Sequence, residues 1–401
     1  MTLALALNDT ARTHALLREQ RAWLAANDDA IVRDQIALSE IASPTGAESR
    51  RGAAVAERMR SLGLEVHTDG IGNVIGRRRG ERDAEPVVVC AHLDTVFPAG
   101  ADVRVAREGP RLVGAGIGDN ARGLAAMLAM ARVIDGTALR TERPIDFLAS
   151  VGEEALGDLR GAKHYFAGAG RDAHAAVILD GPGEERVIHR AVGSRRWRVR
   201  YAGPGGHSWS AYGLPNPLNA AGAVAAMLAV LPVPSEPRSA LTVARIVGGL
   251  SVNAIPGDAL IEIDLRSVAQ DVIERIAREV RACVDVALGD ENARRAHGTP
   301  PLTMTVEVIG DRPGGETPAS HPLVLAAAEA TRLIGREPEL GAASTDANVP
   351  ISLGIPAVAL GAGGRGGSAH TPQEWFENVD GTAGLGRALT VICCAAGVAA
   401  R

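Results

Sequence analysis

The sequence has 401 residues, of which 46% are hydrophobic and 22% are charged, and its formal net charge is −5. This length exceeds that of one ordinary hydrophobic core, so we expect two domains, and the composition is that of a folded globular protein. The small negative charge and the lack of a concentrated basic patch argue against a nucleic-acid partner. The sequence contains no run of 18 apolar residues, which argues against a membrane-spanning helix.

The amino-terminal residues and the cysteines bear on the cellular location. The first seven residues are mostly apolar, but they have no basic segment and no clear cleavage site, so we do not predict a signal peptide. The four cysteines, at positions 90, 283, 393 and 394, lack the spacing of a zinc site. This usage is typical of a reduced protein, and we expect a cytoplasmic location.

Helices and strands alternate through the first half of the chain. Apolar residues at helical spacing predict helices over residues 11–42, 53–62, 122–134 and 159–167. Apolar runs predict strands over residues 64–68, 73–77, 87–92, 144–151 and 175–179. This alternation favours an α/β domain, in which the carboxyl ends of the strands meet along one edge of the sheet.

Residues that can bind a metal ion follow these strands repeatedly. They are His92 with Asp94, Asp119, Glu153 with Glu154, and Asp180. Each has an ordinary alternative, namely a core histidine, a helix N-cap at Asp119, surface glutamates, and a turn-forming aspartate at Asp180. Four such cases in succession favour a common site, because open α/β sheets bind ligands at the carboxyl ends of their strands.

A glycine-rich segment precedes Asp119, with glycines at positions 114, 116 and 118. A dinucleotide-binding loop requires the spacing G-x-G-x-x-G, which these glycines do not have. The spacing therefore argues against a nucleotide-dependent oxidoreductase.

The middle of the chain is predicted to be an inserted module. Its expected elements, in chain order, are strand 195–201, helix 216–231, strands 240–246 and 259–266, helix 271–288 and strand 302–309. The order β-α-β-β-α-β suggests a ferredoxin-like fold. The α/β pattern then resumes with helix 321–335, strand 356–360 and helix 381–399. We therefore expect a discontinuous domain of residues 1–193 and 310–401, with residues 194–309 inserted in it.

A glycine-rich loop between the last strand and the closing helix contributes His370. The candidate ligands are then two imidazoles and three carboxylates, from His92, Asp119, Glu154, Asp180 and His370. Nitrogen and oxygen ligands without thiolate suit zinc, and also cobalt or manganese. Five such ligands beside a spare glutamate suit a two-metal hydrolytic site.

These motifs resemble those of the dinuclear zinc metallopeptidases that include glutamate carboxypeptidase, acetylornithine deacetylase, succinyl-diaminopimelate desuccinylase and peptidase T. The matching segments lie in the family's order over nearly the whole chain, at residues 92–94, 114–120, 152–154, 180, 205–208, 253–256, 264–266 and 370–372. The resemblance implies a zinc-peptidase-like catalytic domain with a mixed central sheet. It also implies that the inserted α+β module is a lid through which two copies form a dimer.

The resemblance implies a role for each candidate residue. Asp119 would bridge two zinc ions, and the peptide bond that follows it would be cis. Glu154 and His370 would complete one metal site, and His92 and Asp180 the other. Asp94 would orient the ring of His92.

Glu153 would be the general base of this site. It would take a proton from the metal-bridging water and later deliver it to the leaving amine. A positioned carboxylate in this role adds roughly 10²–10⁴-fold to a reaction rate.

Three residues of the inserted module also match the family. His207 would reach into the partner subunit's site and stabilise the developing oxyanion. Arg266 would bind a substrate carboxylate through two hydrogen bonds, and Asn253 would help to hold the substrate or the oxyanion. A turn residue is the ordinary alternative for His207, and a surface charge is that for Arg266. Residues 344–346 lie where relatives bind substrate, with a polar turn as the alternative.

The predicted activity is hydrolysis of an amide bond in a small peptide. The segment 209–216, after His207, looks closest to peptidase-T-like members and favours a peptide substrate. An N-acyl-amino-acid amidohydrolase or deacetylase and a carboxypeptidase remain alternatives. A non-catalytic metal-binding scaffold is the alternative from another class, and the presence of Glu153 beside all five ligands argues against it.

Overall fold

The computed structural model describes residues 3–399 as two compact units. The larger unit consists of the chain before Val192 and after Gly315, and the inserted unit is Val192–Gly315. The expected α/β fold with an inserted α+β module is confirmed. We keep as a proposal the domain boundaries predicted from the sequence, which lie between residues 193 and 194 and between residues 309 and 310. Among residues 3–399, no helix has the length and apolar character that crossing a membrane requires.

The larger unit is built on a nine-stranded mixed sheet with the order β1-β2-β6-β3-β7-β17-β8-β15, in which β16 also pairs with β8. The strands are β1 (Glu65–Thr68), β2 (Val74–Arg78), β3 (Val87–His92), β6 (Ile145–Ser150), β7 (Ala175–Leu179), β8 (Arg186–Ala191), β15 (Gly315–Glu316), β16 (Glu339–Ala343) and β17 (Ala357–Leu360). The central strands β6, β3, β7 and β17 run parallel to one another. Their carboxyl ends therefore lie along one edge of the sheet.

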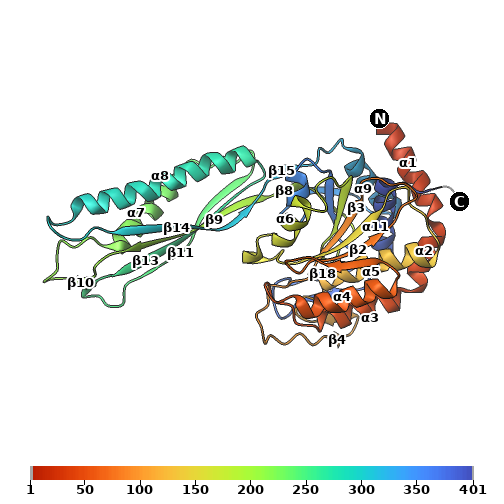
Figure 1. The fold of residues 1–401 in the computed structure, drawn as a ribbon, viewed down its shortest axis with the longest axis horizontal. Coiled ribbons are helices and arrows are strands. Elements are labelled where there is room, and N and C mark those ends of the chain that lie inside the picture. Colours follow the sequence, from red (N-terminus) through yellow and green to blue (C-terminus); the bar gives the residue numbers. More distant parts are fainter. Residues whose placement is uncertain (1–2, 400–401) are drawn as a thin grey trace. The chain divides into compact units, whose positions relative to one another are not determined.

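Both faces of the central sheet are covered by helices (Figure 1). Alternate residues of β3 belong to different cores, with Val87, Val89 and Ala91 on one face and Val88 and Cys90 on the other. The first face packs against α4 (Ser49–Ser61), α5 (Ala121–Gly136), α9 (Pro322–Leu333) and α11 (Gly381–Ala396). The second face packs against α6 (Arg160–Ala167) and α10 (Asn348–Ser352). Burial on both faces explains why these strands are continuous apolar runs.

The segment expected to be helical, residues 11–42, is helical as far as Ser39, but it belongs to three consecutive helices rather than to one. They are α1 (Leu3–Leu16), α2 (Arg18–Ala26) and α3 (Asp28–Ser39). Asn27 ends α2, and its side-chain amide donates a hydrogen bond to the carbonyl oxygen of Trp23 at 2.8 Å. Leu17, Leu24 and Ile31 are nevertheless buried in one core at intervals of seven residues. This apolar stripe continues across the breaks, which is why the sequence pattern resembles that of one helix.

A second, four-stranded sheet joins two loops that are far apart in the sequence. Its strands, in spatial order, are β18 (Arg365–Gly367), β19 (Trp375–Glu377), β5 (Arg111–Val113) and β4 (Ala106–Glu108). Trp375 pairs with Val113 in this sheet. The pairing places the loop that carries His370 beside the glycine-rich segment that leads to Asp119.

The inserted unit is an antiparallel sheet covered by two helices (Figure 1). In chain order it contains β9 (Gly193–Ala202), β10 (Gly206–His207), α7 (Pro217–Ala229), β11 (Ser239–Gly248), β12 (Ala254–Ile255), β13 (Asp258–Ser267), α8 (Gln270–Arg294) and β14 (Thr303–Arg312). The four long strands have the order β11-β13-β9-β14. Alternate residues of β13 face the helices, and acidic residues between them form cross-strand ion pairs such as Arg198–Glu262 at 2.8 Å.

We expect Asp146→Ala to lower the free energy of unfolding by about 3 kcal/mol, measured by urea denaturation. The buried Asp146 carboxylate accepts two hydrogen bonds from Arg77 and one from the hydroxyl of Tyr165, each at 2.6 Å. Removing the carboxylate leaves the buried hydroxyl and the guanidinium without these partners. The exposed pair Arg79–Glu65 provides the control, because Glu65→Ala should cost less than about 1 kcal/mol. Equal losses in the two variants would contradict this account.

Candidate metal centre

The predicted ligands lie at the carboxyl edge of the central sheet. His92 is the last residue of β3 and is paired in register with Ser150, the last residue of β6. Glu153 and Glu154 follow β6 and precede a short 3₁₀ helix, Ala155–Gly157. Asp180 follows β7 directly, and His370 stands in the loop after β17. The parallel arrangement of the strands thus brings side chains from four separate segments to one place.

The donor atoms form two groups that share Asp119. One group is His92, Asp119 and Asp180, and the other is Asp119, Glu154 and His370, with the donor atoms of each group within 4.8 Å of one another. Oδ1 of Asp119 lies 3.0 Å from Nε2 of His92, and its Oδ2 lies 3.2 Å from Nε2 of His370. Asp119 therefore presents one oxygen to each group, which is the arrangement that a bridging carboxylate requires.

Glu153 lies in a third group with His92 and Glu154, again with donor atoms within 4.8 Å of one another. Its side chain is buried, with 5% of the residue exposed. Glu153 thus lies beside one donor of each of the other two groups, His92 and Glu154.

Asp94 contacts both the histidine and the glutamate pair. Nδ1 of His92 lies 3.0 Å from the backbone oxygen of Asp94 and 3.6 Å from its Oδ1. The carboxylate accepts the backbone N–H groups of Glu153 at 2.9 Å and Glu154 at 3.0 Å, and the hydroxyl of Thr45 at 2.8 Å. Asp94 thus orients the backbone of Glu153 and Glu154, which sequence reasoning missed. Burial raises the pKa of Asp94, but its interactions with His92 and with these N–H groups outweigh burial and hold the pKa at about 2.

The electrostatics of the centre favour bound cations. Burial raises the pKa of Glu154 to about 7, and the charge of Asp119 contributes to this rise. The hydrogen bond to Asp119 raises the pKa of His370 to about 9. Burial lowers the pKa of His92, but its hydrogen bonds to Asp119, Asp180 and Asp94 outweigh burial and raise it well above the usual value. A cluster that stabilises positive charge on two imidazoles, with nitrogen and oxygen donors, fits divalent ions such as zinc, cobalt or manganese.

Asn120 caps the helix that follows Asp119. The side-chain oxygen of Asn120 accepts the N–H of Gly123 at 3.0 Å, and its amide donates to the oxygen of Leu179 at 2.9 Å. The alternative that Asp119 is the N-cap is therefore wrong, because the neighbouring residue has that role. The Asp119–Asn120 peptide bond is cis, as the family resemblance implied. Asn120 also ties the start of α5 to the end of β7, beside Asp180.

Three fully buried arginines hold the backbone around the centre. Arg51 donates to the oxygen of Leu93 at 3.0 Å, between His92 and Asp94. Arg122 donates to the oxygen of Ala362 at 2.7 Å, and Arg387 donates to that of Gly361 at 3.2 Å. Burial lowers the pKa of each of these arginines to about 10. Sequence reasoning missed all three, since their partners are carbonyl groups.

A cavity of about 300 Å³ adjoins Asp119 and Asp180. Its other lining residues are Gly181–Gly183, Arg186, Ile188, Ala343–Thr345, Ala359–Gly361 and Ala369. Ser344 and Thr345 thus line a space next to the candidate ligands. Asp346 lies beneath the site instead, where it is buried and accepts a hydrogen bond from Ser150.

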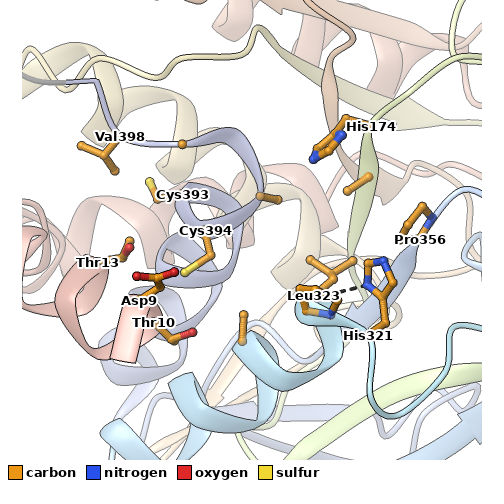
Figure 2. Close-up of a pocket in the computed structure, with 15 residues that line it drawn as sticks. Asp9, Thr10, Thr13, His174, His321, Leu323, Pro356, Cys393, Cys394 and Val398 are labelled. Atoms are coloured by element: carbon orange, nitrogen blue, oxygen red, sulfur yellow. Dashed lines mark hydrogen bonds between the residues drawn. The ribbon is translucent and has the colours of Figure 1, made fainter. Parts of the chain in front are cut away.

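A second cavity, of about 310 Å³, lies at the opposite edge of the sheet (Figure 2). It is lined by His174, which precedes β7, by Pro356, which precedes β17, and by Cys394 of α11. Figure 2 shows His174 and His321 on one side of this space, with Nδ1 of His321 accepting the N–H of Leu323 at 3.2 Å. Because these residues lie at the amino ends of the strands, this cavity is separate from the candidate metal centre.

Within the inserted unit, His207 and Asn253 lie together. His207 is in β10, which pairs with β12, and the N–H of Ser208 donates to the oxygen of Asn253 at 2.9 Å. Arg266 is near the far end of β13, where its Nε lies 2.8 Å from Oδ2 of Asp264. The backbone of Gly257, which leads into β13, bonds to that of Gly203 on the side of His207. The strand from Asp258 to Arg266 spans about 26 Å, so Arg266 is far from the other two residues in this unit.

Comparison with known proteins agrees with this arrangement. The model for peptidase family M20/M25/M40 matches residues 88–393. The uncharacterized protein YqjE of Bacillus subtilis (strain 168) is 25% identical over 369 residues, which are 87% of this chain and 93% of that protein. The N-carbamoyl-L-amino acid amidohydrolase of Geobacillus stearothermophilus is 32% identical over 135 residues, which are 33% of this chain and 28% of that protein.

Solved structures share the fold. Aminopeptidase PepT from Bacillus cereus superimposes with a TM-score of 0.73 at 22% identity, over 91% of this chain and 98% of that one. A tripeptidase from Staphylococcus aureus superimposes with a TM-score of 0.75 at the same identity and coverage. The family expected from the sequence motifs is confirmed. Because the matched region includes every candidate metal ligand from His92 to His370, the chain belongs to peptidase family M20/M25/M40.

Proposed function

We propose that the protein is a two-metal hydrolase that cleaves an amide bond in a small peptide. Membership of the family makes it a metal-dependent hydrolase of peptide or amide bonds, and the scaffold alternative is set aside. The substrate, the metal and the roles of single residues are our proposal. The observation that carries it is the pair of donor groups that share Asp119, with Glu153 beside them.

Two zinc ions are the proposed cofactors, with cobalt or manganese as substitutes. His92 and Asp180 would hold one ion, Glu154 and His370 the other, and Asp119 both. When bound, such ions bring the pKa of a water molecule to about 7 and polarise a carbonyl oxygen. The donor set supports this assignment, since it contains no thiolate and stabilises positive charge.

Glu153 is the proposed general base. Its carboxylate would take a proton from the attacking water and deliver it to the nitrogen of the leaving amine. Burial beside His92 and Glu154 supports this role, as does the anchoring of its backbone N–H on Asp94 at 2.9 Å. This hydrogen bond fixes the backbone of Glu153, so that its carboxylate would need little reorientation during the reaction.

The proposed substrate is a short peptide. The cavity beside Asp119 and Asp180, at about 300 Å³, is at the small end of the range of ligand pockets, which favours a small substrate. The peptidase names of two structural neighbours support a peptide. The match to an N-carbamoyl-L-amino acid amidohydrolase favours the alternative of an N-acyl amino acid. The four cysteines are free thiols, which supports the proposed cytoplasmic location.

We also propose that two copies form a homodimer through the inserted unit. We assign both His207 and Arg266 to the binding of one substrate. In one chain, however, β13 separates the end of the unit that carries His207 from the end that carries Arg266, and this strand spans about 26 Å. A tripeptide reaches only about 11 Å when fully extended. One of these residues would therefore act in the site of the partner subunit, and His207 is the one we assign to it.

The edge of the inserted sheet supports this dimer. Among the strands described in residues 3–399, β11 is an edge strand that pairs with β13 on one side only, and its Ile246 and Val247 are 45% and 47% exposed. Leu250 and Val252, which follow it, are fully exposed. A long edge strand with exposed apolar residues is a site for pairing with another strand. A second copy of the chain would cover this edge.

We expect Glu153→Gln to lower kcat at least 100-fold and to leave metal content unchanged, because the amide cannot accept the proton. The measurements are turnover of a panel of dipeptides, tripeptides and N-acyl amino acids with added zinc, cobalt or manganese, and metal analysis of the protein. Glu57→Gln, on the exposed side of α4, is the control. A near-normal rate in Glu153→Gln would remove the proposed role, and full activity of metal-free enzyme would remove the two-metal mechanism.

We expect the affinity for zinc to rise by up to about tenfold for each pH unit between pH 7 and 9. The pKa of His370, at about 9, means that a metal ion must displace a proton from this imidazole throughout that range. Below pH 7 the rise should be steeper, because the pKa of Glu154 is about 7 and this group then carries a proton as well. Competition with a chelator of known pH dependence measures the affinity. A pH-independent affinity would contradict the assignment of these two ligands.

We expect mixed dimers to recover activity that neither parent variant has. His207→Ala and Glu153→Gln each disable a different half of the site, so a dimer with one chain of each type has one complete site if His207 acts in the partner. The two variants, with different affinity tags, are unfolded together, refolded and purified through both tags. Mixed dimers without activity would argue against sharing of His207, and a purely monomeric protein would argue against the dimer itself.

A further inference from the structure

Glu374 lies in the same loop as His370 and is almost fully buried, with 2% of the residue exposed. Its carboxylate accepts three backbone N–H groups of the segment before the shared ligand. Oε2 accepts from Gly116 at 3.0 Å, and Oε1 accepts from Gly118 at 2.8 Å and from Asp119 at 2.7 Å. The backbone oxygen of Glu374 also accepts the N–H of Gly114 at 2.9 Å. No role for Glu374 follows from the sequence motifs.

We propose that Glu374 is a positioning residue, which holds Asp119 in the orientation that binds both metal ions and couples that orientation to the loop of His370. This inference rests on the proposed two-metal function. Because the backbone N–H of Asp119 is bound directly to Glu374, the position of its Cα is set. Its Oδ1 and Oδ2 then face His92 at 3.0 Å and His370 at 3.2 Å.

The glycines before Asp119 support this role. Successive backbone N–H groups that converge on one point make a binding site for an anion. Here the anion is the carboxylate of Glu374. A Cβ atom at position 118 would lie 3.0 Å from Oε1 of Glu374, and one at position 116, where φ is +76°, would lie 2.8 Å from Thr95. The close approach of the Glu374 carboxylate thus accounts for the glycine at position 118, and the positive φ and the contact with Thr95 account for that at position 116.

The negative charge of Glu374 would strengthen the binding of cations at the neighbouring site. A buried carboxylate next to Asp119 adds like charge to a cluster that is already acidic, which opposes stability unless positive charge balances it. Three N–H donors offset part of this cost. Bound divalent ions would balance the rest, so the charge contributes to metal affinity more than to the stability of the fold alone.

The test is zinc affinity of the metal-free protein, measured by competition with a chelator. Glu374→Gln keeps the shape of the side chain but removes its charge, and its amide group faces the N–H of Gly116. We expect zinc affinity to fall 10- to 100-fold, as for other residues that orient metal ligands. Glu377→Gln is the control, since Glu377 lies in β19 and its nearest cation is Arg111 at 3.8 Å. This control should bind zinc like the unmodified protein.

The melting temperature of the metal-free variant separates positioning from a merely structural role. A positioning role predicts a fall in zinc affinity with a nearly unchanged melting temperature before zinc is added, and a smaller rise on its addition. A lower melting temperature with normal zinc affinity would overturn the inference, as would a variant that matches the unmodified protein in both. If the unmodified protein binds no divalent metal, the proposed function itself fails, which is a distinct result.

Discussion

The structure depends on a cluster of largely buried carboxylates, whose charge hydrogen bonds and positive groups must offset. Asp119 is at its centre, with one oxygen directed at each of two imidazoles. Carboxylates at this depth are costly unless hydrogen bonds and opposite charges accompany them. Several neighbours supply those hydrogen bonds: Asn120 caps the following helix, Glu374 binds the backbone of Asp119, and Asp94 binds the backbone of the glutamate pair. The central sheet then provides a rigid base, because its strands are buried on both faces.

Rigid support matters here because the proposed ligands come from strand ends and loops that are distant in the sequence. A two-metal site requires its donors to be placed within a fraction of an ångström, and side chains on loops reach that accuracy only if the loops themselves are held. The buried guanidinium groups of Arg51, Arg122 and Arg387 bind loop carbonyls on several sides of the centre. The four-stranded sheet that contains β5 and β19 joins the segment of Asp119 to that of His370. The centre is thus held by backbone contacts as much as by side chains.

The inserted unit raises a different question, which is how the residues at its two ends would serve the one small substrate that we propose. His207 and Asn253 lie at one end of its sheet, and Arg266 lies near the other. The length of β13 separates these groups by more than a short peptide can span. The proposed dimer would resolve this separation, since each chain would contribute one end of its inserted unit to its own site and the other end to that of its partner. The exposed edge strand β11 is consistent with such an assembly.

The sequence by itself predicted the α/β architecture, the inserted β-α-β-β-α-β unit and the set of polar residues at the strand ends. It did so because buried parallel strands are apolar runs, and the residue after each run stands at a known edge of the sheet. Only the tertiary structure decided that residues 3–39 form three helices, that Asn120 rather than Asp119 caps α5, and that Asp94 and Glu374 hold the backbone of the site. The physical reason is the same for both carboxylates. Their partners are backbone N–H groups, which nearly every residue has. Such contacts therefore cannot be recognised from the residue types in the sequence, and only the folded structure shows them.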